Sequence, residues 1–158
     1  MQTISFRQAK LSDLEAIVAL LAADEIGRSR ETVSVPVEAC YLSAFQAIEA
    51  DDNQELVVAE QAGEVVGTLQ LSYIPGIARR GSWRGQIEAV RIAETRRGMG
   101  LGQRMFEWAI DRCKSRGCGL VQLTSDKNRP NAHRFYESIG FVSSHEGYKL
   151  ELLGSRPR

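Results

Sequence analysis

The sequence is poor in the residues that build disulfide or metal-stabilised frameworks. Its 158 residues include only three cysteines and two histidines. Cys40, Cys113 and Cys118 are odd in number and form no C-x-x-C pair, so a disulfide framework is not expected. We therefore expect reduced thiols and, with so few soft ligands, no metal site.

Long apolar runs are also absent. No stretch approaches the roughly 18 residues that span a membrane, and the first residues, MQTISFRQAK, contain no signal-peptide apolar region. The composition, 43% hydrophobic and 25% charged, suits one globular domain with a substantial core. We expect a single soluble domain over residues 1–158, located in the cytoplasm and with no membrane partner.

Neither sign of charge is in excess, because 20 basic residues balance 20 acidic ones. The balance hides an asymmetry along the chain. Residues 1–64 hold 4 basic and 12 acidic residues, a net charge of −8, whereas residues 65–158 hold 16 and 8, a net charge of +8. The second half is therefore the half suited to binding an anion. Its arginines form no run of five cations, so we expect no nucleic-acid partner.

Hydrophobic periodicity predicts strands and helices in a mixed order. Strands are predicted at 3–8, 56–60, 65–73, 83–92 and 120–124, with a last pair near 142–144 and 148–152. Helices are predicted to begin near residues 12, 37, 101 and 131. Ser12 and Glu15 have the spacing of a capping box for the first helix. This order predicts an α/β domain with a mixed central sheet.

The stretch from Ile87 to Gly102, IEAVRIAETRRGMGLG, joins a predicted strand to a predicted helix. Its glycines let the backbone approach a ligand closely, and the helix start adds unpaired N–H donors, which together suit a phosphate or pyrophosphate. Gly102 is followed by Gln103 and Arg104, which excludes a Walker A loop, and the glycine spacing does not fit a dinucleotide fingerprint. The alternative is a glycine-rich turn that only caps the helix.

Two motifs carry a resemblance to a known family. Arg97, Gly100 and Gly102 form the pattern R-x-x-G-x-G, and residues 131–141 read NAHRFYESIGF. Both resemble the GNAT superfamily of N-acetyltransferases, in which the first pattern is the acyl-CoA pyrophosphate loop. Phe135 or Tyr136 alone would more often be a core residue. The joint occurrence of both motifs, in the family's order, favours the resemblance.

The resemblance implies a fold and a co-substrate. The fold would be a mixed, mostly antiparallel central sheet of about seven strands flanked by about four helices. The co-substrate would be acetyl-CoA, with strand backbone groups on the pantetheine amides, the loop on the pyrophosphate and an arginine on the 3′-phosphate. The residues implied for CoA binding are Val90, Ile92, Arg97, Gly98, Gly100, Leu101, Gly102, Asn131 and Arg134.

The resemblance further implies transfer of an acetyl group to a primary amine of a small molecule, by direct attack in a ternary complex. An amine with a pKa near 10.4 is mostly protonated at pH 7, so a base must remove a proton. By resemblance, Glu88 is the candidate base and Tyr136 the candidate acid beside the thioester sulfur. The alternative for Glu88 is a structural ion pair with Arg84 or Arg91.

Two matters stay open in the sequence. The alternative to an enzyme is a catalytically silent acyl-CoA-binding or regulatory module on the same fold, although such a module would have no use for Glu88 and Tyr136. The amine acceptor is not identified, because acidic residues such as Asp24 and Glu25 fit a cationic amine and fit solvent equally well. A homodimer is expected only because such proteins are commonly dimeric.

Overall fold

The sheet is centred on a hairpin whose two strands are apolar on both faces. The structure, a computed structural model, describes residues 3–152. β2 (Gln54–Gln61) and β3 (Glu64–Ile74) meet at a tight turn, in which Ala62 and Gly63 both have positive φ, 54° and 82°. Five residues of these strands have no exposed surface at all: Val57, Val58, Ala59, Leu69 and Leu71. The hairpin therefore lies between two apolar layers.

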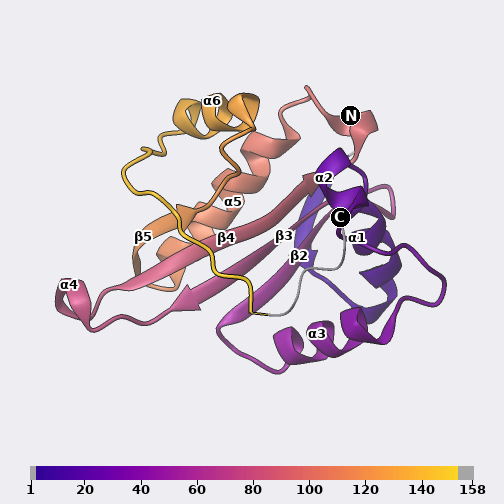
Figure 1. The fold of residues 1–158 in the computed structure, drawn as a ribbon, viewed down its shortest axis with the longest axis horizontal. Helices are drawn as coiled ribbons and strands as arrows, with labels where there is room; N and C mark the ends of the chain where they lie inside the picture. The colour runs from indigo at the N-terminus through magenta and orange to yellow at the C-terminus, as the bar shows by residue number, and fades with distance from the viewer. Residues whose placement is uncertain (1–2, 153–158) are drawn as a thin grey trace. The chain divides into compact units, whose positions relative to one another are not determined.

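Over residues 3–152 the sheet has five strands in the order β1-β2-β3-β4-β5 (Figure 1). The other strands are β1 (Ile4–Gln8), β4 (Trp83–Ile92) and β5 (Cys118–Leu123). The first four pair antiparallel with their neighbours. The predicted strands up to residue 124 are confirmed within one or two residues.

β5 runs parallel to β4, which makes the sheet mixed as predicted. A side chain at Gly119 would meet Ser82, and Gln122 Nε2 donates to Gln86 Oε1 (2.6 Å) further along both strands. Contacts that advance together along two neighbouring strands require parallel strands. A parallel pair needs a crossover connection, and the helix that follows β4 provides it.

Six α-helices lie in the described part of the chain, two more than predicted. They are α1 (Leu14–Leu21), α2 (Glu25–Arg28), α3 (Ala39–Glu49), α4 (Ala78–Gly81), α5 (Leu101–Ser115) and α6 (Pro130–Ser138). The two helices that the sequence did not predict, α2 and α4, are four residues long. A single turn shows no hydrophobic period, so its sequence reads as a loop.

Opposite faces of the sheet pack against different helices. Leu14, Ile17 and Val18 of α1 and Phe45 of α3 form one cluster with β2, which contributes Leu56 and Val58. Successive strand residues point to opposite faces, so Val57 and Ala59 face the other side. There, Gly67 is the ladder partner of Ala59, and a Cβ on Gly67 would lie 2.9 Å from Met105 Sδ of α5. The small side chains at this contact let α5 approach the sheet closely.

The chain divides into two compact units, one up to Gln122 and one from Leu123 on. All five strands begin in the first unit. In the second, α6 is followed by irregular backbone over residues 141–152. The predicted fold of about seven strands is therefore wrong in its last two, near 142–144 and 148–152. The alternating apolar pattern of 148, 150 and 152 predicted a strand, but a strand forms only where a neighbouring strand completes its hydrogen bonds, and no ladder includes these residues.

The first helical segment starts differently from the prediction. A 3₁₀ turn (Leu11–Asp13) precedes α1, and Asp13 Oδ2 accepts a hydrogen bond from the Lys10 backbone N–H (2.7 Å). Asp13 replaces the predicted pair of Ser12 and Glu15 in this role. Its carboxylate also binds Arg7 of β1, at 2.7 and 3.0 Å, and Arg7 in turn binds Glu60 of β2. This network ties the start of the helical layer to the sheet.

We expect Asp13→Asn to lower the free energy of unfolding by about 1 to 3 kcal/mol at pH 7, since it removes a charge-assisted hydrogen bond from a nearly buried group. The hydrogen bonds from Arg7 hold the pKa of Asp13 below its usual range. A carboxyl whose pKa is lowered by folding stabilises the fold above the unfolded value of about 3.9, and this contribution is lost as the pH falls through the folded value. The free energies of unfolding of the wild type and of Asp13→Asn, measured with urea, should therefore differ less at pH 3 than at pH 7.

Glu15→Gln is the matched control, because Glu15 is exposed and two residues away. It should change stability by no more than about 0.5 kcal/mol at either pH. An equal deficit for Asp13→Asn at both pH values would show that the Asp13 charge does not stabilise the fold.

Candidate active site

The end of β4 contains a β-bulge. Gln70 of β3 pairs with Glu88 and Thr68 pairs with Arg91, so Leu69 faces two residues instead of one. Ala89 lies within the bulge with φ of 54°, in the left-handed region that an alanine rarely adopts. Such strained positions persist only where the surrounding structure holds them, and they gather at functional sites.

Beyond the bulge, one edge of β4 extends past the end of its neighbour. Gln122, one residue before the last residue of β5, lies opposite Gln86. β4 continues to Ile92 and stays paired with β3 up to that residue. On the other side, no strand of the described sheet pairs with the stretch that contains Val90 and Ile92. The Val90 carbonyl accepts a hydrogen bond from Arg91 Nη1 (2.9 Å), and the other backbone groups of these two residues on that edge are placed to bind an extended ligand.

The glycine loop follows β4 directly and ends at the start of α5. A 3₁₀ turn (Glu94–Arg96) is anchored by Ala93, whose N–H donates to the Val66 carbonyl (2.9 Å). Gly98 and Gly100 then take left-handed conformations, with φ of 74° and 76°, and a Cβ on either would meet nothing within 4 Å. The loop thus presents bare backbone to open space, next to the N-terminal turn of α5, where Leu101 is buried and holds the helix start in place.

The two arginines of this loop have different surroundings. Arg96 Nε donates to the Gln61 side chain at 2.7 Å, a firm hydrogen bond to β2. Arg97 is exposed, and its Nε makes only a long contact of 3.4 Å to the Ile92 carbonyl. Arg97, which the sequence analysis assigned to phosphate binding, is therefore held by weaker contacts than Arg96.

Glu88, the candidate base, is exposed. Within residues 3–152 its carboxylate has no ion-pair partner. The alternative ion pair with Arg91 does not form, because Arg91 Nε lies 3.5 Å from Asp24 Oδ2. Glu88 therefore lies on the sheet as an unshielded carboxylate, next to the strained Ala89.

The second unit holds the other predicted residues. Asn131 and Arg134 lie one turn apart on α6, and Arg134 donates a hydrogen bond to Asn131 Oδ1. The Tyr136 ring makes edge contacts with Phe135 and Phe141, at centroid distances of 5.7 and 6.3 Å. Glu88 belongs to the first unit and Tyr136 to the second, so their joint action stays a prediction.

Cys113 and Cys118 do not have the surroundings of a nucleophile. Burial raises the pKa of the Cys113 thiol to about 12, and burial also raises the pKa of Cys118. A reactive thiol needs the opposite shift, because the thiolate is the nucleophile. In the part of the chain that the structure describes, no group of three His, Cys, Asp or Glu is placed to hold a metal ion. No helix there is long and apolar enough to cross a membrane.

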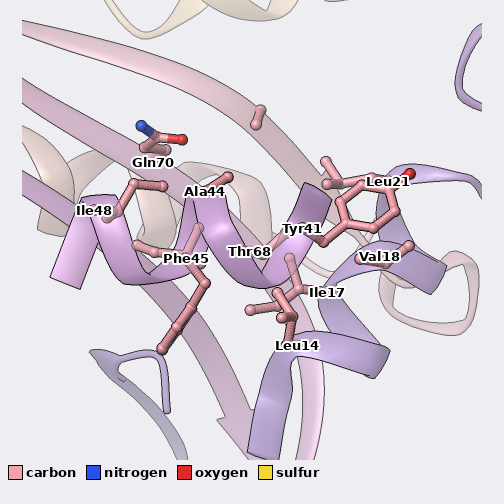
Figure 2. Close-up of a pocket in the computed structure, with 12 residues that line it drawn as sticks. Leu14, Ile17, Val18, Leu21, Tyr41, Ala44, Phe45, Ile48, Thr68 and Gln70 are labelled. Atoms are coloured by element: carbon pink, nitrogen blue, oxygen red, sulfur yellow. The ribbon is translucent and has the colours of Figure 1, made fainter. Parts of the chain in front are cut away.

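The sequence gave no indication of a cavity of about 130 Å³ between α1, α3 and the sheet (Figure 2). Its wall is mostly aliphatic and aromatic, and Gln70 and Ala89, the neighbours of Glu88, belong to it. Ala44 of α3 also belongs to the wall, and only the fold brings this small residue over the sheet.

Comparisons with known proteins agree with this geometry. Aminoalkylphosphonate N-acetyltransferase of Salmonella typhimurium is 26% identical over 145 residues, which cover 92% of this chain and 89% of that protein. A solved structure described as a transcriptional regulator from Bacillus halodurans C-125 is 47% identical, with a TM-score of 0.92 over 95% of this chain and 100% of that one. Glucosamine-6-phosphate N-acetyltransferase from Arabidopsis thaliana is 25% identical, with a TM-score of 0.78 over 96% and 99%.

The resemblance carried by the two motifs is confirmed by the match to a family model. The model of the acetyltransferase (GNAT) family matches residues 16–141, which include the β4 bulge, the glycine loop and α6. This match covers well over half of the chain, and the chain therefore belongs to the acetyltransferase (GNAT) family.

Proposed function

We propose that this protein transfers an acetyl group from acetyl-CoA to a primary amine of a small molecule, acting as one acetyltransferase domain. The observation that carries the proposal is the continuous path from Glu88, through the bulge and the free edge of β4, to the left-handed glycines before α5. Two relatives named as N-acetyltransferases, of aminoalkylphosphonate and of glucosamine 6-phosphate, support a small amine as the acceptor.

Acetyl-CoA would bind along the path that the first unit leaves open. The N–H and C=O groups of Val90 and Ile92 would bind the pantetheine amides. The loop N–H groups, from Gly98 to Gly102, and the exposed Arg97 would hold the pyrophosphate. Asn131 and Arg134 of α6 are proposed for the CoA arm and its 3′-phosphate. Acetyl-CoA supplies an activated thioester, and these residues orient its carbonyl carbon.

In the proposed reaction the amine attacks the thioester directly. Glu88 takes a proton from the ammonium, the amine nitrogen forms a bond to the carbonyl carbon, and the carbon–sulfur bond breaks. The thiolate that leaves takes a proton from the Tyr136 hydroxyl, so CoA departs as a free thiol, and the second proton that the nitrogen loses restores that hydroxyl, while Glu88 releases its proton to solvent. No cysteine relay is needed, since the Cys113 thiol is buried and holds its proton.

A catalytically silent acyl-CoA-binding or regulatory module is the second candidate. It is favoured by one observation, the description of the 47% identical relative as a transcriptional regulator. The experiment that separates the two candidates is the release of CoA thiol from acetyl-CoA in the presence of a panel of amines, including polyamines, amino sugars and aminoalkylphosphonates. Tight acetyl-CoA binding without thiol release above the uncatalysed rate for every amine would favour the silent module.

Gly100→Val should weaken acetyl-CoA binding by about tenfold or more, equivalent to about 1.4 kcal/mol. A branched side chain would occupy the open space beside the loop and would disfavour its left-handed conformation. Titration calorimetry measures the effect. Gly63→Val is the control, since Gly63 has a similar φ of +82° with equally open surroundings but lies in the β2–β3 turn. Equal affinities for the two variants would exclude the loop from the site.

Glu88→Gln should lower kcat by about 10² to 10⁴, the usual range for a lost general base. Its dissociation constant for acetyl-CoA should stay nearly constant. A base must be deprotonated to act, so wild-type turnover should decline toward acidic pH, and this acidic limb should disappear in the variant. Glu64→Gln, at the exposed start of β3, is the control and should retain both turnover and pH profile. Normal turnover with an intact acidic limb in Glu88→Gln would assign the proton transfer to water or to another residue.

Tyr136→Phe should lower kcat most strongly for poor acceptors, because the departing thiolate loses its proton donor. The variant keeps the ring and therefore its contacts to Phe135 and Phe141. The alkaline limb of the turnover profile should change while the acidic limb stays. A variant whose alkaline limb matches that of wild type would give Tyr136 a packing role only.

A further inference from the structure

The cavity beneath α3 adjoins the proposed base. Glu88 and Gln70 are direct ladder partners, so their Cβ atoms share one face of the sheet at a separation of about 5 Å. Gln70 lines the cavity, and so does Ala89, the next residue along β4. The bulge thus places two consecutive residues of β4 at the cavity, one carboxylate beside it and one methyl group in its wall.

The cavity wall consists mostly of apolar side chains and offers a guest few groups for hydrogen bonding. Figure 2 shows aliphatic side chains of α1 and α3 facing the strands across the gap. Three polar side chains of the wall are hydrogen-bonded within the protein itself, among them Gln70, whose Nε2 donates to Gln54 Oε1 (3.2 Å). Thr68 Oγ1 donates to the Val57 carbonyl (2.9 Å), and the Tyr41 hydroxyl donates to Glu31 (2.8 Å) and accepts from the Thr32 N–H (2.9 Å). A guest in this space would gain apolar contact but few hydrogen bonds.

The size of the cavity limits the guest. Apolar cavities of about 150 Å³ hold one benzene molecule, so 130 Å³ has room for an alkyl group of about four to five carbons. Access is available at Ala44, which lines the cavity and is exposed. Burial of each methylene group of a guest would contribute about 0.8 kcal/mol.

We infer that this cavity is the acceptor subsite for an alkyl group, and that the acceptor is a primary amine carrying a compact apolar chain of about four to five carbons. The inference rests on the proposed function and names its substrate class. The ammonium lies at Glu88, where the charges are complementary, and the alkyl group enters between α1, α3 and the sheet. Ala44 then determines specificity, because a larger side chain there fills the space that the alkyl group needs.

The test uses a series of primary amines from methylamine to hexylamine, together with isopentylamine, on the full chain. With acetyl-CoA present, kcat/KM for thiol release should rise with chain length to an optimum at four or five carbons. Ala44→Leu should lower the ratio of kcat/KM for isopentylamine to kcat/KM for methylamine by about tenfold or more, since one methylene in an apolar pocket changes such a ratio by at least about that factor. Ala47→Leu, exposed on the same helix but outside the cavity wall, should match wild type.

Two further measurements keep the inference falsifiable. Ile48→Ala enlarges the cavity and should move the optimum toward hexylamine, even if Ala44→Leu fails to fold. Binding of isopentylamine, followed by NMR shifts of the Ala44 and Ala89 methyl groups, gives a readout that does not need turnover. Thiol release with other amines but no preferential binding of isopentylamine over methylamine would overturn the alkyl subsite and leave the proposed function standing. Saturable binding of isopentylamine that Ala44→Leu abolishes, without thiol release for any amine, would retain the subsite and overturn the enzyme.

Discussion

The burial of the β2–β3 hairpin on both faces is the constraint on which the rest of the structure depends. Val57, Val58, Leu69 and Leu71 are completely enclosed, and the burial of each such side chain contributes about 1.5 to 3 kcal/mol. A shift of one residue in the register would exchange the two faces and bring Thr68 and Ser72 toward α5 in place of Leu69 and Leu71. The α1/α3 layer on one side and α5 on the other therefore hold this ladder in a single register.

Because packing holds the sheet in one register, the bulge in β4 keeps a fixed position. β4 follows the register of β3 through Glu88 and then departs from it at Ala89, where the backbone takes a left-handed conformation. In a loosely packed sheet this strain, of the order of 1 to 3 kcal/mol, would relax by a slip of the strand. Here Ile87 is buried before the bulge and Leu101 after the loop, so the irregular stretch is fixed at both ends. The proposed catalytic and CoA-binding groups of the first unit all lie on this stretch or next to it.

The exposed position of Glu88 bears on its proposed role. Within residues 3–152 its carboxylate has no ion-pair partner and is open to the ammonium group of an acceptor, whereas an ion pair with Arg91 would have occupied it. Asp24 prevents that pair, since it engages Arg91 while its other oxygen caps the Gly27 N–H at 2.6 Å. The short helix α2 thus contributes to the site through charge, although its sequence gives no helical signal.

Much of this arrangement could be predicted from the residues. The glycine loop was placed correctly between a strand and a helix because β-branched residues, glycines and a helical period follow one another within sixteen residues, and each of these is a local property. The start of α1 was misassigned because Ser12 and Asp13 are both good capping residues, and only the position of Arg7 on β1 selects Asp13. The last two strands were wrong because the alternation at 148–152 is a necessary condition for a strand and not a sufficient one.

The sequence by itself determined the order of the first five strands and of the four longer helices, the place of the glycine loop before α5 and the family of the chain, because these depend on neighbouring residues. Only the tertiary structure decided that an alanine would adopt positive φ, that Arg91 would pair with Asp24 instead of Glu88, and that Ala44, Gln70 and Ala89 would enclose one cavity. Each of these joins residues that are far apart in the chain. Their energies come from packing and charge contacts that exist only once the sheet is closed on both faces, so no local pattern could have predicted them.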